Sequence, residues 1–327
     1  MLAALAGLAG CSGAESPSGT AASAGTAPPR AGPPAPSQQR LGAVSWPTRG
    51  TSAADISGIG LTDGPGATRQ VPIASVTKLM TAYVILQDHP LPGDEPGPDI
   101  TVEPSEAAAY PSQARDGDSL VAVAAGETIS ERQALEALLL PSADNMAWIL
   151  ARWDAGSQGA SAAKMNAAAR RLGMTGTSYT DASGLDSATT STAADQVQLG
   201  TAAMAVPALA AITAMPTAVV PVAGLIRNTN TLLGQDGIVG LKTGSTQAAG
   251  GCLLVAAWQE VRGRKTLIVA AAFGQPGTAA TILPNALQAG RSLVLALESA
   301  LSPDSPDAPS DSHDDSERPP RGHPRAP

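Results

Sequence analysis

A serine and a lysine three residues apart are the side chains in this sequence best suited to covalent chemistry. They open and close the run Ser75-Val76-Thr77-Lys78, at the start of a segment with apolar residues at helical spacing. On a helix, this spacing places both side chains on one face. A serine hydroxyl needs a base beside it, and a lysine can serve only where burial or a nearby cation lowers its pKa. Taken alone, the same pattern is also common at helix N-termini.

Two more polar clusters follow far downstream. Ser142-Ala143-Asp144-Asn145 separates two apolar helical segments, and Lys242-Thr243-Gly244 lies inside an extended run. A strand with a lysine and a glycine lets a substrate backbone approach closely and offers a carboxylate a partner. Each cluster alone has an ordinary explanation, because serine, aspartate and asparagine are usual helix caps.

The positions of the few lysines favour a chemical role for two of these clusters. The chain has only four lysines, and two of them, Lys78 and Lys242, fall in the clusters. Because arginine stays protonated, a chain that otherwise favours arginine is expected to keep lysine where proton transfer requires it.

The elements that must position these residues are helices and strands in mixed order. Apolar residues recur at helical spacing in six segments: Val76 to Asp88, 131–140, 143–154, 161–172, 192–213 and 278–300. Period-2 or continuous apolar runs predict strands at 236–245, 250–259 and 264–274, the last two joined as a hairpin. Consecutive strands after a helical middle indicate an α+β fold with an antiparallel sheet and a helical cluster.

Composition narrows the function classes. The 327 residues carry a net charge of −8 and no basic run, which argues against a nucleic-acid partner. Of three histidines only His89 lies outside the C-terminal tail, so neither a zinc site nor any other metal or cofactor is expected. Cys252 sits in an apolar run and is predicted to be a small buried side chain rather than half of a disulfide.

Four segments are expected along the chain. Residues 1–11 resemble a lipoprotein signal that ends at Cys11, the residue that would be acylated, although no basic residue precedes the apolar run. Residues 12–41 are rich in Ser, Ala, Gly and Pro and predict a flexible tether. Residues 42–300 form the folded domain, and 301–327 predict a disordered acidic, Pro-rich tail.

In their order and spacing, the three clusters resemble the motif set of penicillin-binding proteins and serine β-lactamases. The residues around the three clusters resemble most the low-molecular-mass penicillin-binding proteins, the D-alanyl-D-alanine carboxypeptidases. The segments that carry this resemblance are Pro72 to Ala82, Met165 to Met174, Asp181 to Asp186, and Asn228 to Gly244. The resemblance implies a transpeptidase-like α+β fold with a flanked antiparallel sheet and an all-helical part.

The resemblance implies a penicillin-sensitive serine carboxypeptidase that removes the terminal D-alanine of peptidoglycan stem peptides. Ser75 would be the nucleophile that forms the acyl-enzyme, and Lys78 the general base. Ser142 would pass a proton to the leaving amine. The implied partners are the stem peptide, β-lactams as acylating inhibitors, and the outer face of the bacterial plasma membrane through the lipid anchor.

The resemblance also implies a substrate-binding strand. Lys242 and Thr243 would hold the substrate carboxylate, and Gly244 would allow close approach. The backbone N–H of Ser75 and of Ser245 would form the oxyanion hole. Asp144 departs from the family, which usually has asparagine at the third position of the middle motif.

The departure at Asp144 leaves three outcomes open. An ionised aspartate only accepts hydrogen bonds, and beside Lys78 it would favour the charged amine and weaken the base. Asn145 would point about 100° away on a helix. Either the turn shifts so that Asn145 serves, or Asp144 replaces the amide, or activity is reduced.

Two other functions are alternatives to the carboxypeptidase. A class A β-lactamase needs a glutamate downstream of the middle motif, yet no glutamate occurs between Ser142 and Glu260. A wall-binding lipoprotein that keeps the fold but has lost turnover is favoured only by Asp144. A β-lactam labelling gel would separate an active from an inactive Ser75.

Overall fold

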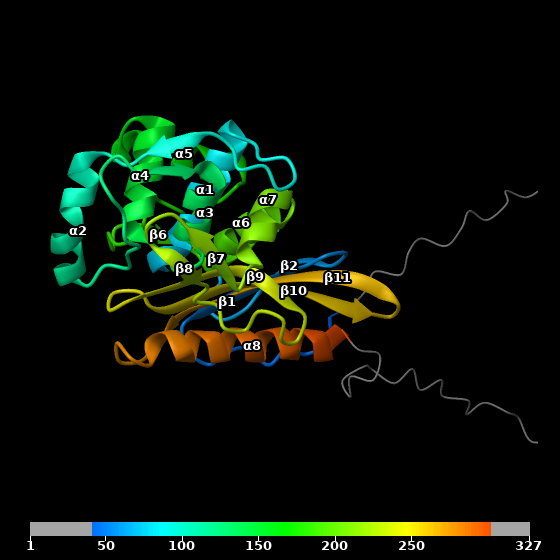
Figure 1. Cartoon of the computed structure of the whole chain (residues 1–327). Coiled ribbons are helices and arrows are strands. Elements are labelled where there is room, and N and C mark those ends of the chain that lie inside the picture. Colours follow the sequence, from blue (N-terminus) through cyan, green and yellow to red (C-terminus); the bar gives the residue numbers. More distant parts are fainter. Residues whose placement is uncertain (1–40, 302–327) are drawn as a thin grey trace, which may run out of the picture. The chain divides into compact units, whose positions relative to one another are not determined.

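An antiparallel sheet of five strands forms the middle layer of the computed structural model, which describes residues 41–301 (Figure 1). Its strand order is β2-β1-β11-β10-β9. The strands are β1 (Thr51–Ile56), β2 (Gly60–Asp63), β9 (Ile238–Thr246), β10 (Gly250–Val261) and β11 (Arg264–Gln275). The long strands are rich in Val, Ile, Leu and Ala and are buried on both faces, as expected for a central layer.

A single long helix covers one face of the sheet. Helix α8 (Ile282–Leu301) lies beneath the strands in Figure 1 and presents one apolar stripe to them. Leu293, Val294 and Leu297 of this stripe are completely buried against side chains of β1, β10 and β11. Burial of this apolar stripe holds α8 against the sheet after the last strand, β11.

The opposite face carries the helical cluster. It contains six helices: α1 (Thr77–Asp88), α3 (Glu131–Leu139), α4 (Asp144–Ala155), α5 (Gln158–Arg171), α6 (Ala193–Met204) and α7 (Pro207–Thr213). Helix α1 is buried along most of its length and contacts α3, α4, α5 and α6. Because α1 begins two residues after Ser75, the nucleophile candidate stands at the N-terminal end of a helix that packs inside the cluster.

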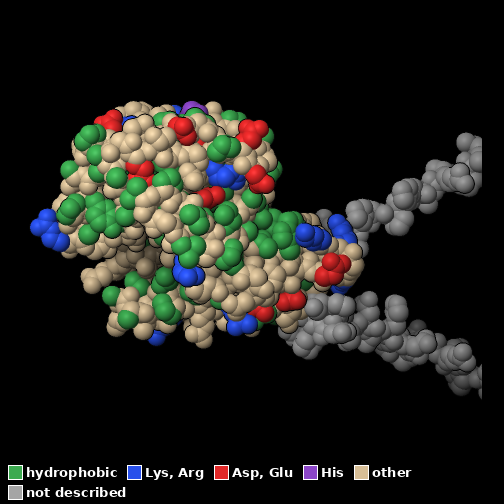
Figure 2. All heavy atoms as spheres, viewed as in Figure 1, with side chains coloured by type: hydrophobic (Ala, Val, Ile, Leu, Met, Phe, Trp, Pro, Cys, Tyr) green, Lys and Arg blue, Asp and Glu red, His purple; other side chains and the backbone are tan. Residues whose placement is uncertain are grey.

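Short elements complete the structure at the rim. They are the 3-10 turn η1 (Ala74–Val76), the outlying helix α2 (Pro104–Asp116), and three two-stranded pairs: β3 (Val71–Pro72) with β6 (Thr190–Ser191), β4 (Asp99–Thr101) with β5 (Thr128–Ser130), and β7 (Thr217–Val220) with β8 (Gly224–Arg227). On the face drawn in Figure 2, acidic and basic side chains are interspersed, and a hollow opens between the helical layer and the sheet layer.

The fold class predicted from the sequence is confirmed, but one predicted helix is divided in two and one helix was not predicted. The segment 192–213 is two helices bent by 108°, because Pro207 has no N–H to continue α6 and instead starts α7. Helix α2 was not predicted, since it buries no residue and carries Pro111 in its interior. A capping box between Glu103 and Glu106 starts this helix without the help of an apolar stripe.

Several predictions concern residues that the structure does not describe. The signal segment 1–11 with Cys11, the tether and the acidic tail lie outside residues 41–301, apart from residue 41 and residue 301. Within the described range, Cys252 is a free and fully buried thiol on β10. In the same range no single helix has the length and apolarity to cross a membrane, and only the bent pair α6 and α7 reaches that threshold jointly.

Candidate active site

Helix geometry brings Ser75 and Lys78 together at the start of α1. The amine Nζ of Lys78 lies 2.8 Å from the hydroxyl Oγ of Ser75. Ser75 is partly exposed in η1, whereas Lys78 is completely buried one turn later. The predicted pairing of these two side chains is therefore present in the fold.

Lys78 has three acceptors around its amine. Besides Ser75 Oγ, they are Asp144 Oδ1 at 2.6 Å and the carbonyl oxygen of Ser183 at 3.0 Å. An ammonium group has three N–H donors and can serve all three acceptors. A neutral amine keeps two donors, which match Asp144 and Ser183, and turns its lone pair toward Ser75 Oγ. The arrangement thus suits both protonation states of the lysine.

Burial decides the direction of the Lys78 pKa. Desolvation is the largest effect and lowers the pKa, while the negative charge and hydrogen bond of Asp144 oppose it. More distant carboxylates, Asp181 and Asp118, also oppose it, and the net direction is still downward. A lowered pKa makes the neutral amine accessible, which a general base requires.

The first turn of α4 presents two neighbouring side chains to different partners. Asp144 is buried; its Oδ2 accepts from the backbone N–H of Ser119 at 2.9 Å while its Oδ1 contacts Lys78. Asn145 faces elsewhere, with its Nδ2 donating to the carbonyl of Val121 at 2.8 Å and its Oδ1 accepting from the Val121 N–H at 3.3 Å. Of the two candidates for the third motif position, Asp144 therefore reaches Lys78.

Ser142 occupies a constrained position before α4. Its backbone has a φ of 67°, a left-handed conformation that is uncommon for serine. Its Oγ is buried and has no hydrogen-bond partner among the described residues. Ala74, directly before the nucleophile candidate, also has a positive φ of 48°. Such strain tends to gather at functional sites because the surrounding packing must maintain it.

Strand β9 forms the other wall of the site. A Cβ atom added at Gly244 would lie 3.0 Å from the backbone nitrogen of Ser75, so glycine permits the closest approach of the strand to the nucleophile turn. Thr243 Oγ1 shares a 2.6 Å hydrogen bond with Thr229 Oγ1. Ser245 is exposed, and its side chain points to solvent rather than into the core.

Lys242 is the second buried lysine of the site. Its Nζ donates to the carbonyl of Thr243 at 3.0 Å and has no acidic partner among the described residues. Burial, followed by repulsion from Lys78, holds the pKa of Lys242 well below its usual range. A substrate carboxylate beside it would supply the missing negative charge and favour the protonated form.

The sequence did not reveal that the loop 181–184 contacts Lys78, through the carbonyl of Ser183. Asp181 accepts hydrogen bonds from Ser183 Oγ at 2.6 Å and from the N–H of Gly184 at 2.7 Å, which fixes the carbonyl of Ser183 toward Lys78. A Cβ at Gly184 would lie 2.0 Å from the carbonyl oxygen of Ala74. The run Asp181-Ala182-Ser183-Gly184 has residues typical of a turn, but Lys78, which it contacts, is far away in sequence.

Residues 41–301 contain no group of three or more metal-ligating side chains.

Comparison with protein families gives one match to this region. The model of the D-alanyl-D-alanine carboxypeptidase family matches residues 62–274, a range that holds every site residue described above.

Several curated proteins are similar in sequence, among them one named an endopeptidase and two named carboxypeptidases. The D-alanyl-D-alanine endopeptidase of Pseudomonas aeruginosa is 37% identical over 63% of this chain and 65% of its own length. The carboxypeptidase DacB2 of Mycobacterium tuberculosis is 42% identical over 47% of this chain and 54% of its own. The D-alanyl-D-alanine carboxypeptidase of Streptomyces strain K15 is 32% identical over 69% and 81%. The chain thus spans less than two thirds of the first two relatives.

Solved structures share the fold. The Streptomyces K15 DD-transpeptidase aligns with a TM-score of 0.66 at 24% identity, covering 77% of this chain and 98% of that one, which is evidence for the fold alone. A penicillin-binding protein homologue from Mycobacterium tuberculosis aligns with a TM-score of 0.61 at 31% identity, covering 74% and 91%.

Proposed function

Because the chain belongs to the D-alanyl-D-alanine carboxypeptidase family, we propose that it is a serine DD-peptidase that removes the terminal D-alanine of peptidoglycan stem peptides. The observation that carries the proposal is the 2.8 Å contact between Ser75 Oγ and a fully buried Lys78 Nζ, beside the edge of β9. A hydroxyl paired with a buried amine is the arrangement of an activated serine nucleophile.

The first half of the reaction forms the acyl-enzyme. Neutral Lys78 takes the proton of Ser75 Oγ as this oxygen bonds to the carbonyl carbon of the scissile amide. The carbonyl oxygen becomes an oxyanion and accepts hydrogen bonds from the N–H groups of Ser75 and Ser245. The C–N bond then breaks, and the proton passes from Lys78 through Ser142 Oγ to the leaving amine. The buried and unpartnered Oγ of Ser142 is available for this transfer.

The second half releases the product. Water attacks the acyl carbon while Lys78 takes one of its protons, and the proton returns to Ser75 Oγ when the ester bond breaks. Lys242 holds the carboxylate of the terminal residue, with Thr243 beside it.

The choice of a carboxypeptidase rests on the resemblance of the residues around the three motifs and on the names of two of the similar proteins. Other similar proteins, from Pseudomonas aeruginosa and Escherichia coli, are named D-alanyl-D-alanine endopeptidases, so the reaction products must distinguish the two activities. Incubation with a D-Ala-D-Ala pentapeptide is expected to release free D-alanine, detected by mass spectrometry. Cleavage of a cross-linked stem dimer without D-alanine release would contradict the carboxypeptidase assignment.

A labelled penicillin tests the nucleophile. We expect one added mass on the peptide that contains Ser75, and none in Ser75→Ala. Ser112→Ala, on the outlying helix α2, is a matched control that should label fully. Label on Ser142 or Ser245, or labelling retained in Ser75→Ala, would contradict this role.

A second candidate is a penicillin-binding protein with little turnover. It is favoured by the 2.6 Å contact between Lys78 and Asp144, because a carboxylate there stabilises the charged amine. Such a protein would be acylated by penicillin once and would release D-alanine only at a trace rate.

We also propose that the protein acts outside the plasma membrane and is held there by lipid on Cys11. The support is the signal-like run that ends at Cys11 and the Ser/Ala/Pro-rich segment after it. Cys11→Ala is expected to move the protein from the membrane fraction to the soluble fraction. Full retention in the membrane fraction would contradict the anchor.

A further inference from the structure

A hollow of about 350 Å³ lies beyond the C-terminal end of β9. Its walls come from Val71 and Pro72, which lead into the nucleophile turn, and from Ala248, Ala249 and Gly250, which follow β9. Pro72 precedes Ser75 by three residues, so their Cα atoms lie at most about 11 Å apart. The hollow therefore adjoins the site without belonging to the catalytic contacts.

Among residues 41–301, the charged side chains that line this hollow are Arg49 and Arg69. Both are exposed at its wall. The guanidinium of Arg49 forms no hydrogen bond or ion pair with any residue in 41–301, and that of Arg69 donates only to the carbonyl of Gly50 at 3.2 Å. The hollow is thus a local concentration of positive charge on a chain whose net charge is −8.

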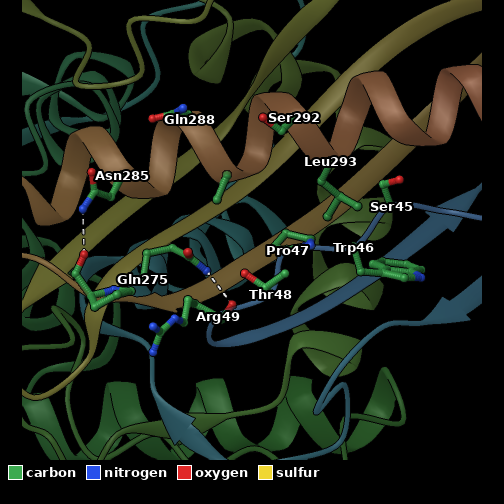
Figure 3. Close-up of a pocket in the computed structure, with 12 residues that line it drawn as sticks. Ser45, Trp46, Pro47, Thr48, Arg49, Gln275, Asn285, Gln288, Ser292 and Leu293 are labelled. Atoms are coloured by element: carbon green, nitrogen blue, oxygen red, sulfur yellow. Dashed lines mark hydrogen bonds between the residues drawn. The ribbon is translucent and has the colours of Figure 1, made fainter.

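The backbone position of Arg49 is fixed by the residues around it. Gln275 Nε2 donates to the carbonyl of Arg49 at 3.0 Å, a bond drawn in Figure 3. Gly50 follows with a φ of 75°, and a Cβ there would lie 1.7 Å from the carbonyl oxygen of Phe273. The separate hollow of Figure 3, between residues 45–49 and α8, also touches Arg49 but contains none of the site residues.

The proposed reaction defines which part of a substrate would reach this hollow. Strand β9 is the edge strand of the sheet, and an extended peptide can lie along such an edge. The terminal carboxylate is held near Lys242 and the scissile carbonyl near Ser245. The acyl-donor part of the peptide must then pass Thr246 toward Ala248. At about 3.3 Å per residue, its third residue lies about 10 Å from the scissile bond, which is comparable with the separation between Ser75 and the Pro72 wall of the hollow.

We propose that Arg49 and Arg69 form a subsite for a carboxylate on the acyl-donor part of the substrate, about three residues before the scissile bond. This inference rests on the proposed function, because it takes the direction of the peptide from the assigned roles of Lys242 and Ser245. Arginine suits the task because its guanidinium can bind a carboxylate through two parallel hydrogen bonds.

The test uses two D-Ala-D-Ala peptides that differ at one group. One carries a glutamate three residues before the scissile bond, and the other carries glutamine there. The wild type is expected to prefer the glutamate peptide in kcat/KM by about two- to tenfold, since each exposed ion pair contributes up to about fivefold. The preference should shrink as salt is raised from low to high concentration, because exposed charges are screened.

Substitution of the arginines should remove the preference. In the double variant Arg49→Gln, Arg69→Gln the ratio between the two peptides is expected to fall to about one, while Arg49→Lys, Arg69→Lys keeps part of it. Arg171→Gln, an exposed arginine on α5, is the control and should keep the wild-type ratio. An unchanged ratio in the double glutamine variant, or equal loss on both peptides, would overturn the subsite.

Benzylpenicillin separates this failure from failure of the proposed function. If the wild type is acylated by benzylpenicillin and releases D-alanine from both peptides equally, only the subsite is wrong. If the wild type is neither acylated nor active on either peptide, the DD-peptidase assignment is wrong and the subsite falls with it.

Discussion

Lys78 is subject to two opposing forces, and its chemistry depends on their balance. Burial disfavours the ammonium, whereas the carboxylate of Asp144, 2.6 Å away, favours it. Desolvation is the larger effect, so the pKa of Lys78 lies below its usual value. The lysine of this site therefore reaches the neutral state at lower pH than an exposed lysine, but at higher pH than it would without Asp144.

Replacing Lys78 and Lys242 by arginine, one at a time, tests whether the first is a general base and the second a binding cation. Lys78→Arg is expected to reduce acylation by penicillin about 10²- to 10⁴-fold, because a guanidinium stays protonated. Lys242→Arg should keep partial activity, because it still offers a cation to a carboxylate. Acylation rates are measured by mass spectrometry after circular dichroism has shown that both variants fold. Equal losses in the two variants would refute this division of roles.

Asp144→Asn should make acylation faster and move its pH profile. The change removes the charge that raises the Lys78 pKa, so that pKa falls further. Because the neutral amine is the active form, the rising limb of rate against pH shifts to lower pH. A fall of one unit would increase the neutral fraction about tenfold on the acid side. The rate of penicillin acylation between pH 5 and 9 checks this, and an unchanged profile would contradict it.

The first turn of α4 orients Asp144 by binding the chain segment in front of it. Asp144 and Asn145 each make two hydrogen bonds to or through residues 119–121, with Ser119 and Val121 as partners. The segment and the turn thus hold each other in place. Asn145 is a positioning residue in this arrangement, although it touches neither Ser75 nor Lys78.

Asn145→Ala is expected to destabilise the fold and to loosen the contact at Asp144. It leaves the buried N–H and C=O of Val121 without partners, which costs about 2–4 kcal/mol of unfolding free energy. Urea unfolding measures this cost. Because the contact between Asp144 and Lys78 is loosened, the rising limb of acylation rate against pH should shift to lower pH, in the same direction as in Asp144→Asn. Wild-type stability in Asn145→Ala would show that these bonds do not hold the segment.

A buried carboxylate in the helical cluster couples the stability of the molecule to pH. Glu131 begins α3, is fully buried, and neither of its side-chain oxygens has a hydrogen-bond partner among the described residues. Burial first, and then the charge of Asp154, raise its pKa to about 7, against the opposing effect of Arg132. In the unfolded chain the carboxyl has an ordinary pKa near 4.5.

The sign of the pH dependence follows from this difference. Between about pH 4.5 and 7 the folded protein binds the proton more tightly than the unfolded chain does, so stability falls as pH rises through this window. Glu131→Gln removes the ionisation. It is expected to stabilise the protein by about 1–3 kcal/mol at pH 8 and by little at pH 4.5. Urea midpoints at both pH values measure this, with the exposed Glu260→Gln as control. An equal effect at both pH values would contradict it.

Local patterns in the sequence were sufficient to predict the pairing of Ser75 with Lys78 and the fold class. A spacing of three residues places Ser75 beside Lys78 in any helix, because the helical repeat is fixed by the backbone. The apolar runs of β10 and β11, joined by a short turn, could only pair as neighbours in an antiparallel sheet. Helix α2 was not predicted because it has no apolar stripe. The break before Pro207 was not predicted because the apolar residues at helical spacing continue on both sides of it.

Only the tertiary structure decided which polar groups surround Lys78. Asp144 and Ser183 lie 66 and 105 residues away from it, and no local rule relates them. From the sequence alone, either Asp144 or Asn145 could have faced Lys78. The rotation of α4 about its axis decides between them, and this rotation is set by packing and by residues 119–121. The same holds for Arg49 and Arg69, which line one hollow only because the segments around β1, β11 and Val71–Pro72 come together there. Helix periodicity acts over a few residues, whereas these contacts depend on how whole elements pack.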